Sequence, residues 1–335
     1  MSKILSNKQL HHQIDEVVNV CGCLGYNKYM IKIVALVGPT AVGKTEISHE
    51  LAEKFSFEIV SCDSMQVYRG MEIGTAKPSP EEIEKYNYHM IDVVSPDYHY
   101  SAGEYARDAD KVIEGIANRG AFPLVSGGSG LYLDALIYGI SSMPKANLDF
   151  REKLRQEAVQ KGSAFLHKLL KEIDSASAEK IHPNDLNRII RAMEVYYLIG
   201  EPMSEIQKIE KNAKKYEHLI IGFNRQRDEL YERVEIRVDR MFEEGLVEEV
   251  RALLDEGYSS QLSSFQALGY KEVAEHLKGK FSLEEAKEKV KKNTRNFAKR
   301  QMTYFRKNKD IKWFDPGSED DIIAVFGEIK KFLNY

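Results

Sequence analysis

A glycine-rich segment near the start of the chain has the residue types that bind phosphate. Residues 38–45 read GPTAVGKT and match the P-loop pattern G-x-x-x-x-G-K-[ST]. In this pattern backbone N–H groups converge on phosphate oxygens, Lys44 supplies a mobile positive charge, and the Thr45 hydroxyl suits Mg²⁺. We therefore predict a diphosphate or triphosphate site with Mg²⁺ as cofactor. Its residues are Gly38, Pro39, Thr40, Ala41, Val42, Gly43, Lys44 and Thr45.

The segments on either side of this loop support the prediction. The continuous apolar run 31–38 is typical of a buried parallel strand, and residues 45–55 carry apolar side chains at a helical spacing of four. A P-loop requires a strand before it and a helix after it, and the helix N-terminus adds partial positive charge. The alternative, an incidental glycine turn, would require neither element.

Polar residues also follow two other predicted strands. Asp63 ends the run FEIVSCD (57–63), and Ser129 lies in SGGSG (126–130) after a third apolar run. Ligands of open α/β sheets bind outside the carboxyl ends of the strands, so both side chains are expected to face the ligand of the P-loop. A helix N-cap or a ligand of a Mg²⁺-bound water is the alternative for Asp63, and a tight strand-to-helix turn is the alternative for residues 126–130.

The order of predicted elements indicates the fold class. Strands at 31–38, 57–63, 89–96 and 121–130 alternate with helical patterns, which predicts an α/β, P-loop NTPase-like core with a mainly parallel sheet. Helical patterns alone occupy 141–217, a strand returns at 219–224, and one long helix is predicted over 229–257. The predicted domains are a core of 30–140 and 218–335, a helical insertion at 141–217, and a poorly ordered extension at 1–29.

Charge and cysteine content limit the classes of function. Forty-eight Lys and Arg against 52 Asp and Glu give a net charge of −4, which excludes nucleic-acid binding by bulk charge alone. Residues 287–309 are different, because ten basic residues and one acid give +9. We predict a helix there that follows phosphates, the alternative being a merely solvated basic face. Three cysteines without metal or disulfide spacing favour a reducing cytoplasm, and no apolar run is long enough for a membrane span.

Six segments in order resemble one family, the tRNA dimethylallyltransferases in their bacterial form. They are GPTAVGKT (38–45), DSMQVYRGMEIGTAKP (63–78), SGGSGLYLDAL (126–136), IHPNDLNRIIRAMEV (181–195), LYERVEIRVDRMFEEGLVEEV (230–250) and QALGYKE (266–272). The resemblance implies transfer of a dimethylallyl group from dimethylallyl diphosphate to the exocyclic N6 of the adenosine beside the anticodon (position 37) of tRNA, with release of diphosphate. It also implies that the P-loop holds this donor rather than ATP.

The resemblance assigns residues to that reaction. Asp63 matches the general base, Ser129 stands where many members have threonine, and Lys44 serves the leaving group. From the residues alone, Arg227 and Arg233, at the start of the predicted helix that contains RVD (237–239), could clamp the diphosphate or form a solvated helix face. The tRNA-contacting residues carried over are Asp63, Ser64, Met65, Gln66, Ser129, Arg151, Asn187, Arg188, Ile189, Ile190, Arg191, Gln266, Ala267, Leu268, Gly269, Tyr270 and Lys271.

Three other interpretations remain open from the residues. An enzyme that prenylates free adenine nucleotides would share the loop and the aspartate, but has little use for a basic helix. A P-loop kinase would use ATP, and a non-catalytic RNA-binding protein would need neither Asp63 nor Ser129. We expect a monomer whose partners are the tRNA anticodon stem-loop and dimethylallyl diphosphate.

Overall fold

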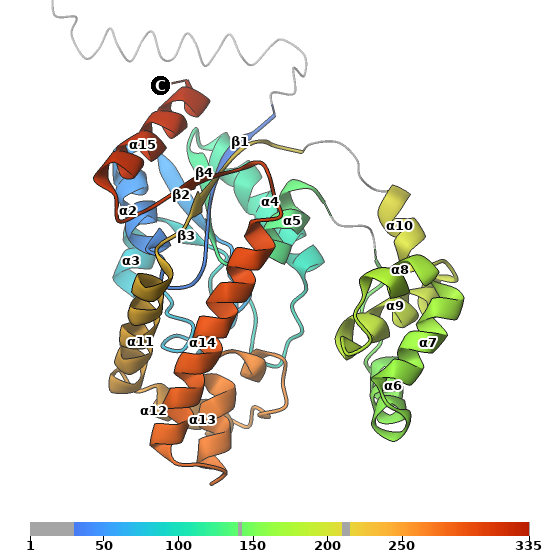
Figure 1. The fold of residues 1–335 in the computed structure, drawn as a ribbon. Helices are drawn as coiled ribbons and strands as arrows, with labels where there is room; N and C mark the ends of the chain where they lie inside the picture. Colours follow the sequence, from blue (N-terminus) through green and yellow to red (C-terminus); the bar gives the residue numbers. More distant parts are fainter. Residues whose placement is uncertain (1–29, 140–142, 210–214, 335) are drawn as a thin grey trace, which may run out of the picture. The chain divides into compact units, whose positions relative to one another are not determined.

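The structure, a computed structural model, describes residues 30–139, 143–209 and 215–334 (Figure 1). The predicted extension at 1–29 lies outside these residues. A six-stranded sheet has the order β3-β2-β4-β1-β5-β6, and each adjacent pair of strands is parallel. The strands are β1 (Lys32–Val37), β2 (Phe57–Ser61), β3 (Tyr88–His89), β4 (Phe122–Gly127), β5 (Glu217–Phe223) and β6 (Ile311–Phe314). The predicted α/β class with a parallel sheet is confirmed.

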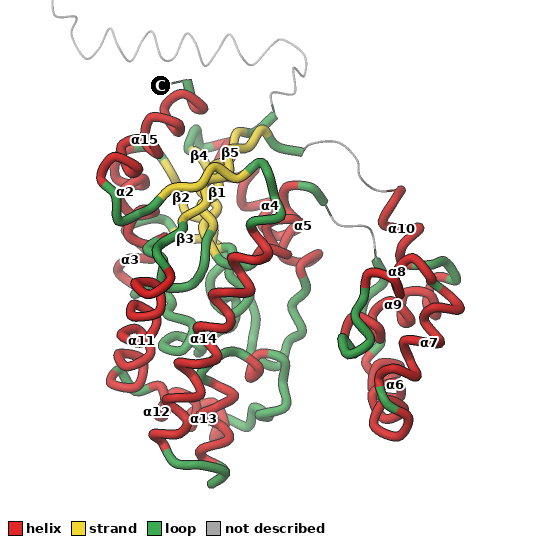
Figure 2. The backbone as a smooth tube through the Cα atoms, in the orientation of Figure 1, coloured by secondary structure: helices red, strands yellow, loops and turns green. Residues whose placement is uncertain are grey.

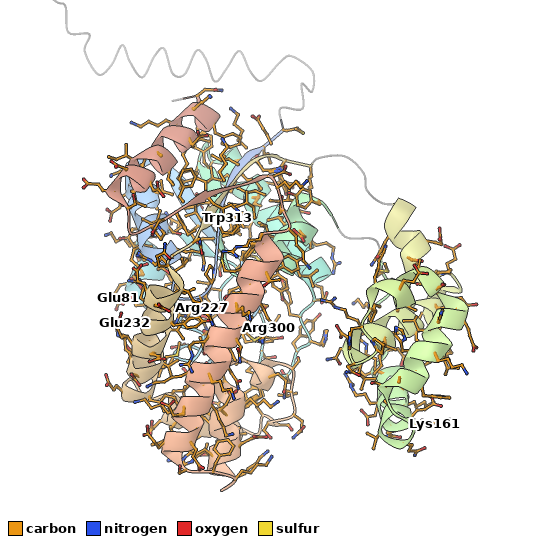
Figure 3. The ribbon with its side chains drawn as sticks, in the orientation of Figure 1. Glu81, Lys161, Arg227, Glu232, Arg300 and Trp313 are labelled. Carbon is orange, nitrogen blue, oxygen red and sulfur yellow. The ribbon has the colours of Figure 1, made fainter. Side chains whose placement is uncertain are left out.

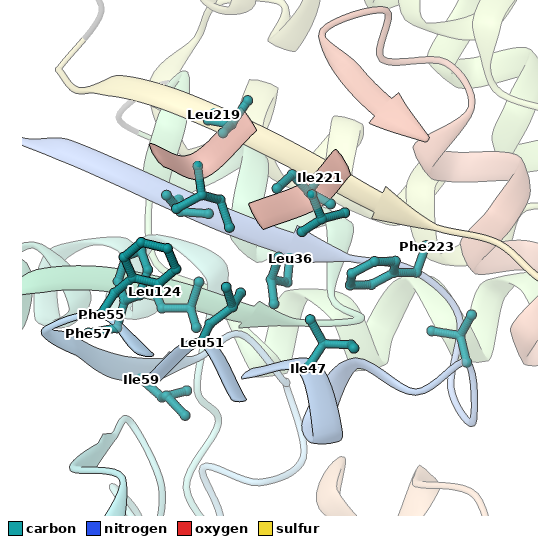
Figure 4. Packing of buried hydrophobic residues seen from close by; sticks show 14 of the residues in the cluster. Leu36, Ile47, Leu51, Phe55, Phe57, Ile59, Leu124, Leu219, Ile221 and Phe223 are labelled. Carbon is teal, nitrogen blue, oxygen red and sulfur yellow. The ribbon is translucent and has the colours of Figure 1, made fainter. Parts of the chain in front are cut away.

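Helices cover both faces of this sheet (Figure 2). In β1, successive side chains point to opposite faces, and both sets are buried because the strand is central. The face that includes Leu36 packs against Leu51 of α2 (Lys44–Lys54) and Ile329 of α15 (Glu319–Leu333), as the close view of this core illustrates (Figure 4). The opposite face is covered by α4 (Ala102–Asn118) and α5 (Gly130–Ile137) (Figure 1).

The segment between α5 and β5 is helical in the parts that the structure describes. Its helices are α6 (Leu148–Lys161), α7 (Ser163–Ile173), α8 (Ser175–Lys180), α9 (Leu186–Ile199) and α10 (Met203–Ile209). They pack around a core of their own that includes Leu166, Leu170 and Ile189. The predicted helical pattern is therefore confirmed, while the division of the chain into core and inserted domain stays a prediction.

The long helix predicted over 229–257 is wrong in one respect, because it is two helices. The first is α11 (Arg227–Glu243) and the second is α12 (Leu246–Asp255). Gly245 between them has φ 102°, a left-handed conformation that glycine adopts at little cost and that ends the α-helical path. Two further helices follow, α13 (Tyr270–Leu277) and α14 (Leu283–Phe305), with a 3-10 turn at Ser264–Gln266 before them.

One strand prediction also needs correction, and one strand was not predicted. The run 89–96 forms only the end of β3, because Met90 and Asp92 adopt positive φ values of 63° and 54° that turn the chain out of the sheet. A helix, α3 (Pro80–Lys85), precedes it. At the other edge of the sheet, the four residues of β6 form a strand beside β5. The sequence analysis did not predict this strand.

Candidate active site

The P-loop lies between the end of β1 and the start of α2, as predicted. Gly43 occupies the position before the helix and has no side chain to accept the first N–H groups of α2. These N–H groups and the helix dipole therefore favour an anion at this end of the helix. The loop belongs to the middle of the sheet, since β1 lies between β4 and β5.

Lys44 lies inside this loop. Its Nζ donates hydrogen bonds to the backbone oxygens of Gly38 at 3.0 Å and Pro39 at 2.8 Å. Burial, and then the nearby Arg237, lower the pKa of Lys44 to about 8, while Asp63 acts in the opposite direction. The charged form of Lys44 is therefore disfavoured, and a bound polyanion would stabilise it.

Arginines of the β5–α11 segment surround the loop. Arg233 donates from Nε to the oxygen of Ala41 at 2.9 Å, so it lies at the P-loop, and its contact with a diphosphate stays a prediction. Arg225 donates to the oxygen of Val42 at 2.9 Å. Burial lowers the pKa of Arg237, which Asp63 raises, so a third guanidinium lies near both Lys44 and the carboxylate.

The predicted clamp residue Arg227 is placed differently. Its side chain is exposed, and its guanidinium lies 5.1 Å from the centroid of the Tyr231 ring on α11 (Figure 3). The role of Arg227 in holding a diphosphate stays a prediction, and the sequence analysis did not name Arg225 and Arg237. The spacing of four between Arg233 and Arg237, which puts them on one helix face, was the signal that could have found Arg237.

Asp63 follows β2 and lies in a turn. Its Oδ1 accepts a hydrogen bond from the backbone N–H of Met65 at 2.8 Å, and the residue is half-buried. It does not cap a regular helix, because the residues that follow it form turns. The carboxylate raises the pKa values of both Lys44 and Arg237, because it lies close enough to these cations to interact with them.

The segment 126–130 is attached to the Asp63 loop. The Oγ of Ser129 accepts from the backbone N–H of Ser64 at 2.9 Å, and the backbone N–H of Ser129 donates to the oxygen of Cys62 at 3.1 Å. The segment is therefore a tight turn, and it also aims a hydroxyl at the loop. Burial raises the pKa of the neighbouring Cys62 thiol to about 12, so this thiol is not an acid or nucleophile near neutral pH.

Gln66 holds the loop that follows Asp63. Its Oε1 accepts from the Ser61 hydroxyl at 2.8 Å, and its Nε2 donates to the backbone oxygens of Ala76 at 3.2 Å and Thr75 at 3.4 Å. On the other side, Glu249 of α12 accepts from the backbone N–H groups of residues 72–74. The predicted tRNA contact Gln66 thus also fixes the loop that contains it.

The predicted tRNA contacts on α6 and α9 differ in exposure. Asn187 and Arg188 are exposed, whereas Ile189 and Ile190 lie in the core of the helices, so their side chains are not available for contact. Arg151 and Arg191 both pair with the fully buried carboxylate of Glu194, at 2.8 Å and 2.5 Å.

The predicted contacts 266–271 divide in the same way. Gln266 and Lys271 are exposed, Leu268 is half-buried, and Ala267 and Gly269 are buried. Tyr270 is fully buried, and its hydroxyl donates to Glu249 Oε1 at 2.5 Å. The side chain of Tyr270 therefore supports the 72–74 loop.

The basic segment is the helix α14, and it has two kinds of cation. Lys287 and Lys291 pair with Asp239 at 2.8 Å, and Arg295 pairs with Glu235 at 2.5 Å, so these cations attach α14 to α11. Lys299 and Arg300 are exposed, and Arg300 lies on α14 alongside α11 (Figure 3). The excess charge of +9 counted from the sequence is thus partly used for packing.

The residues fit a metal that arrives with a ligand. Thr45 is exposed in the first turn of α2, next to Lys44. Within the described ranges, no three acidic, histidine or cysteine side chains come together as metal ligands. Mg²⁺ is usually bound by one or two protein groups together with phosphate oxygens and waters, which Thr45 allows. None of the helices in the described parts of the chain has the length and apolar character needed to cross a membrane.

Comparison with known proteins gives consistent results. The sequence model of the family described as IPP transferase matches residues 66–308. A tRNA dimethylallyltransferase of Geobacter sulfurreducens is 47% identical over 296 residues, covering 88% of this chain and 95% of the relative. One from Thermotoga maritima is 45% identical, covering 90% of this chain and 97% of its own.

Two solved structures are also similar. The tRNA isopentenylpyrophosphate transferase of Bacillus halodurans has a TM-score of 0.67 and 39% identity, covering 91% of this chain and 97% of its own. A eukaryotic dimethylallyltransferase described as acting on tRNA has a TM-score of 0.75 and 28% identity, covering 91% of this chain and 80% of its own.

Proposed function

Since the chain belongs to the IPP transferase family, we propose that it transfers a dimethylallyl group from dimethylallyl diphosphate to the N6 amine of the adenosine beside the tRNA anticodon. The observation that carries this proposal is that Asp63 and the P-loop follow the carboxyl ends of β2 and β1, which flank β4 in one parallel sheet, close enough for Asp63 to raise the pKa of Lys44 and Arg237. A phosphate-binding loop alone suits many enzymes. A carboxylate beside it suits an acceptor that must lose a proton.

The loop serves the leaving group. As the bond between the allylic carbon and oxygen breaks, negative charge accumulates on the diphosphate. The N–H groups at the start of α2 and the cations Lys44, Arg233 and Arg237 lie where they stabilise that charge. Mg²⁺ held by Thr45 and the diphosphate would neutralise further charge when it is bound.

The carboxylate serves the acceptor. The exocyclic amine of adenine is a poor nucleophile, and its N–H proton passes to Asp63 as the new nitrogen–carbon bond forms. A positioned general base contributes about 10²- to 10⁴-fold to the rate. Met65 N–H fixes the Asp63 carboxylate through Oδ1, and Ser129 fixes the loop through Ser64.

The tRNA is held away from the chemistry. Lys299 and Arg300 of α14 and the exposed Asn187, Arg188 and Lys271 suit contacts with phosphates and bases. The adenosine must leave its stack to reach Asp63, at a cost of a few kcal/mol that these contacts offset. We also propose that the protein is a monomer and that it acts in the reducing cytoplasm, as predicted from the sequence.

One experiment separates the proposal from its rivals. The wild-type protein is incubated with Mg²⁺, labelled dimethylallyl diphosphate, and either unmodified tRNA or AMP. We expect label in tRNA alone. Label in AMP would indicate an enzyme of free adenine nucleotides, and label in neither would leave an ATP-dependent kinase or a binding protein.

A further inference from the structure

Gln301 is a buried polar residue on α14 that the reaction above does not use. Its residue exposure is 7%, although its neighbours Lys299 and Arg300 are exposed. Lys299 and Arg300 are therefore open to solvent, whereas this carboxamide faces the protein interior. A buried carboxamide is retained at a cost unless its donor and acceptor are both satisfied.

Both groups of Gln301 bond to the predicted active site. Its Oε1 accepts from the backbone N–H of Thr40 at 2.9 Å, and its Nε2 donates to the backbone oxygen of Gly128 at 3.0 Å. The partners settle the orientation of the carboxamide, since an N–H can meet only the oxygen and a carbonyl only the nitrogen. One side chain thus joins the P-loop to the turn after β4.

The turn is fitted closely to this side chain. A Cβ atom at Gly128 would lie 2.2 Å from Gln301 Nε2, so any other residue there would displace the carboxamide from this position. The next residue, Ser129, holds the Asp63 loop through Ser64 N–H. A continuous series of hydrogen bonds therefore runs from Thr40 through Gln301 and residues 128–129 to the loop of Asp63.

We propose that Gln301 is a positioning residue, which fixes the distance between the P-loop and the Asp63 loop. The proposal rests on the proposed function, since it concerns the alignment of the leaving group with the base. It also means that α14, which carries the exposed cations Lys299 and Arg300, reaches the active site through Gln301. Misplacement of reacting groups by about 1 Å can cost on the order of 10²-fold in rate.

Two near-isosteric variants test the proposal. Gln301→Glu keeps the acceptor for Thr40 but sets a negative oxygen against the Gly128 carbonyl, and Gln301→Met removes both hydrogen bonds. We expect kcat for tRNA prenylation to fall on the order of 10²-fold, as misplacement of the reacting groups predicts. Dissociation constants for dimethylallyl diphosphate and for tRNA should change by less than about threefold, because the side chain is buried and both its polar groups bond to the protein. The matched control is Thr303→Ala. Thr303 is an exposed residue of the same helix, and its hydroxyl donates to the backbone oxygen of Lys299 one turn earlier.

The outcomes are distinguishable. If wild-type protein fails to prenylate tRNA, the proposed function fails. If wild type is active and folded Gln301 variants match its kcat, the positioning role is wrong. It is also wrong if the loss is entirely in the binding of one ligand.

A measurement on the wild type covers the case in which the variants do not fold. Amide hydrogen exchange is followed with and without inorganic pyrophosphate. We expect pyrophosphate to slow exchange at 38–45 and also at 126–130, because Gln301 joins the two segments. Protection confined to 38–45 would overturn the proposal.

Discussion

Replacing Glu249 by glutamine should release the loop of residues 72–74. The carboxylate of Glu249 accepts four hydrogen bonds. Its Oε2 accepts from the N–H groups of Glu72 at 2.9 Å and Ile73 at 2.8 Å, and its Oε1 accepts from the N–H of Gly74 at 3.2 Å and from the Tyr270 hydroxyl at 2.5 Å. A glutamine side chain has one oxygen, so its NH₂ group must face either the N–H groups of Glu72 and Ile73, or the N–H of Gly74 together with the Tyr270 hydroxyl, which can turn to accept.

The size of the effect follows from this count. At least one N–H group loses a charged acceptor, at about 1.5–3 kcal/mol, and the remaining bonds become weaker because their acceptor is neutral, so the sum is about 3–6 kcal/mol. The N–H of Glu72 lies at the surface and can bond to water instead, so the lower end applies. A local change of about 3 kcal/mol corresponds to amide exchange faster by on the order of 100-fold. Tyr270→Phe removes one hydrogen bond to Glu249, and we expect it to cause about half of this change in free energy.

Hydrogen exchange at residues 72–74 is the measurement. The control is Glu248→Gln, because Glu248 is the exposed neighbour on the same helix and its substitution should change stability by less than about 0.5 kcal/mol. If Glu249→Gln leaves the exchange of 72–74 at the wild-type rate, the carboxylate does not hold the loop. The carbonyl partners of Gln66, on Thr75 and Ala76, follow this loop directly in the chain, so tRNA affinity should fall while donor affinity is kept.

Three further outcomes test the site. Asp63→Ala should lower kcat by about 10²- to 10⁴-fold and leave tRNA binding within about twofold, and wild-type turnover would show that Asp63 is not the base. The pKa of Lys44 is lowered to about 8, and a bound diphosphate would raise it, so donor binding above pH 8 should take up a proton that binding near pH 6.5 does not. Calorimetry in buffers of different ionisation heat measures this proton uptake. Lys44→Met should abolish the proton uptake. Lys299→Gln should reduce the salt dependence of tRNA binding by a slope of about 1, whereas Lys287→Gln, which removes a cation paired with Asp239, should leave the slope nearly unchanged. Equal slopes for the two variants would contradict the division of α14 into packing and binding cations.

The parts of the fold that sequence reasoning found are those with local signatures. The P-loop, β1 and α2 are adjacent in the chain, so glycine positions and apolar spacing were enough to place them. Arg225 and Arg237 were missed because their relation to Lys44 depends on how α11 packs against a loop almost 200 residues earlier. The short strand β6 has too few residues to show a period, and only its pairing with β5 makes it a strand. Gln301 had no local signal, since nothing in its neighbourhood of lysines and arginines marks one glutamine as buried.

The contact between Thr40 and Gln301 joins residues 261 positions apart. A chain leaves the ribosome from its N-terminus, so the phosphate-binding loop is synthesised long before the side chain that braces it. The nascent protein can form β1 and α2 early, yet the active-site geometry is completed only after α14 has emerged. Premature termination anywhere before α14 would therefore yield a product with an intact loop sequence and an unbraced, inactive site.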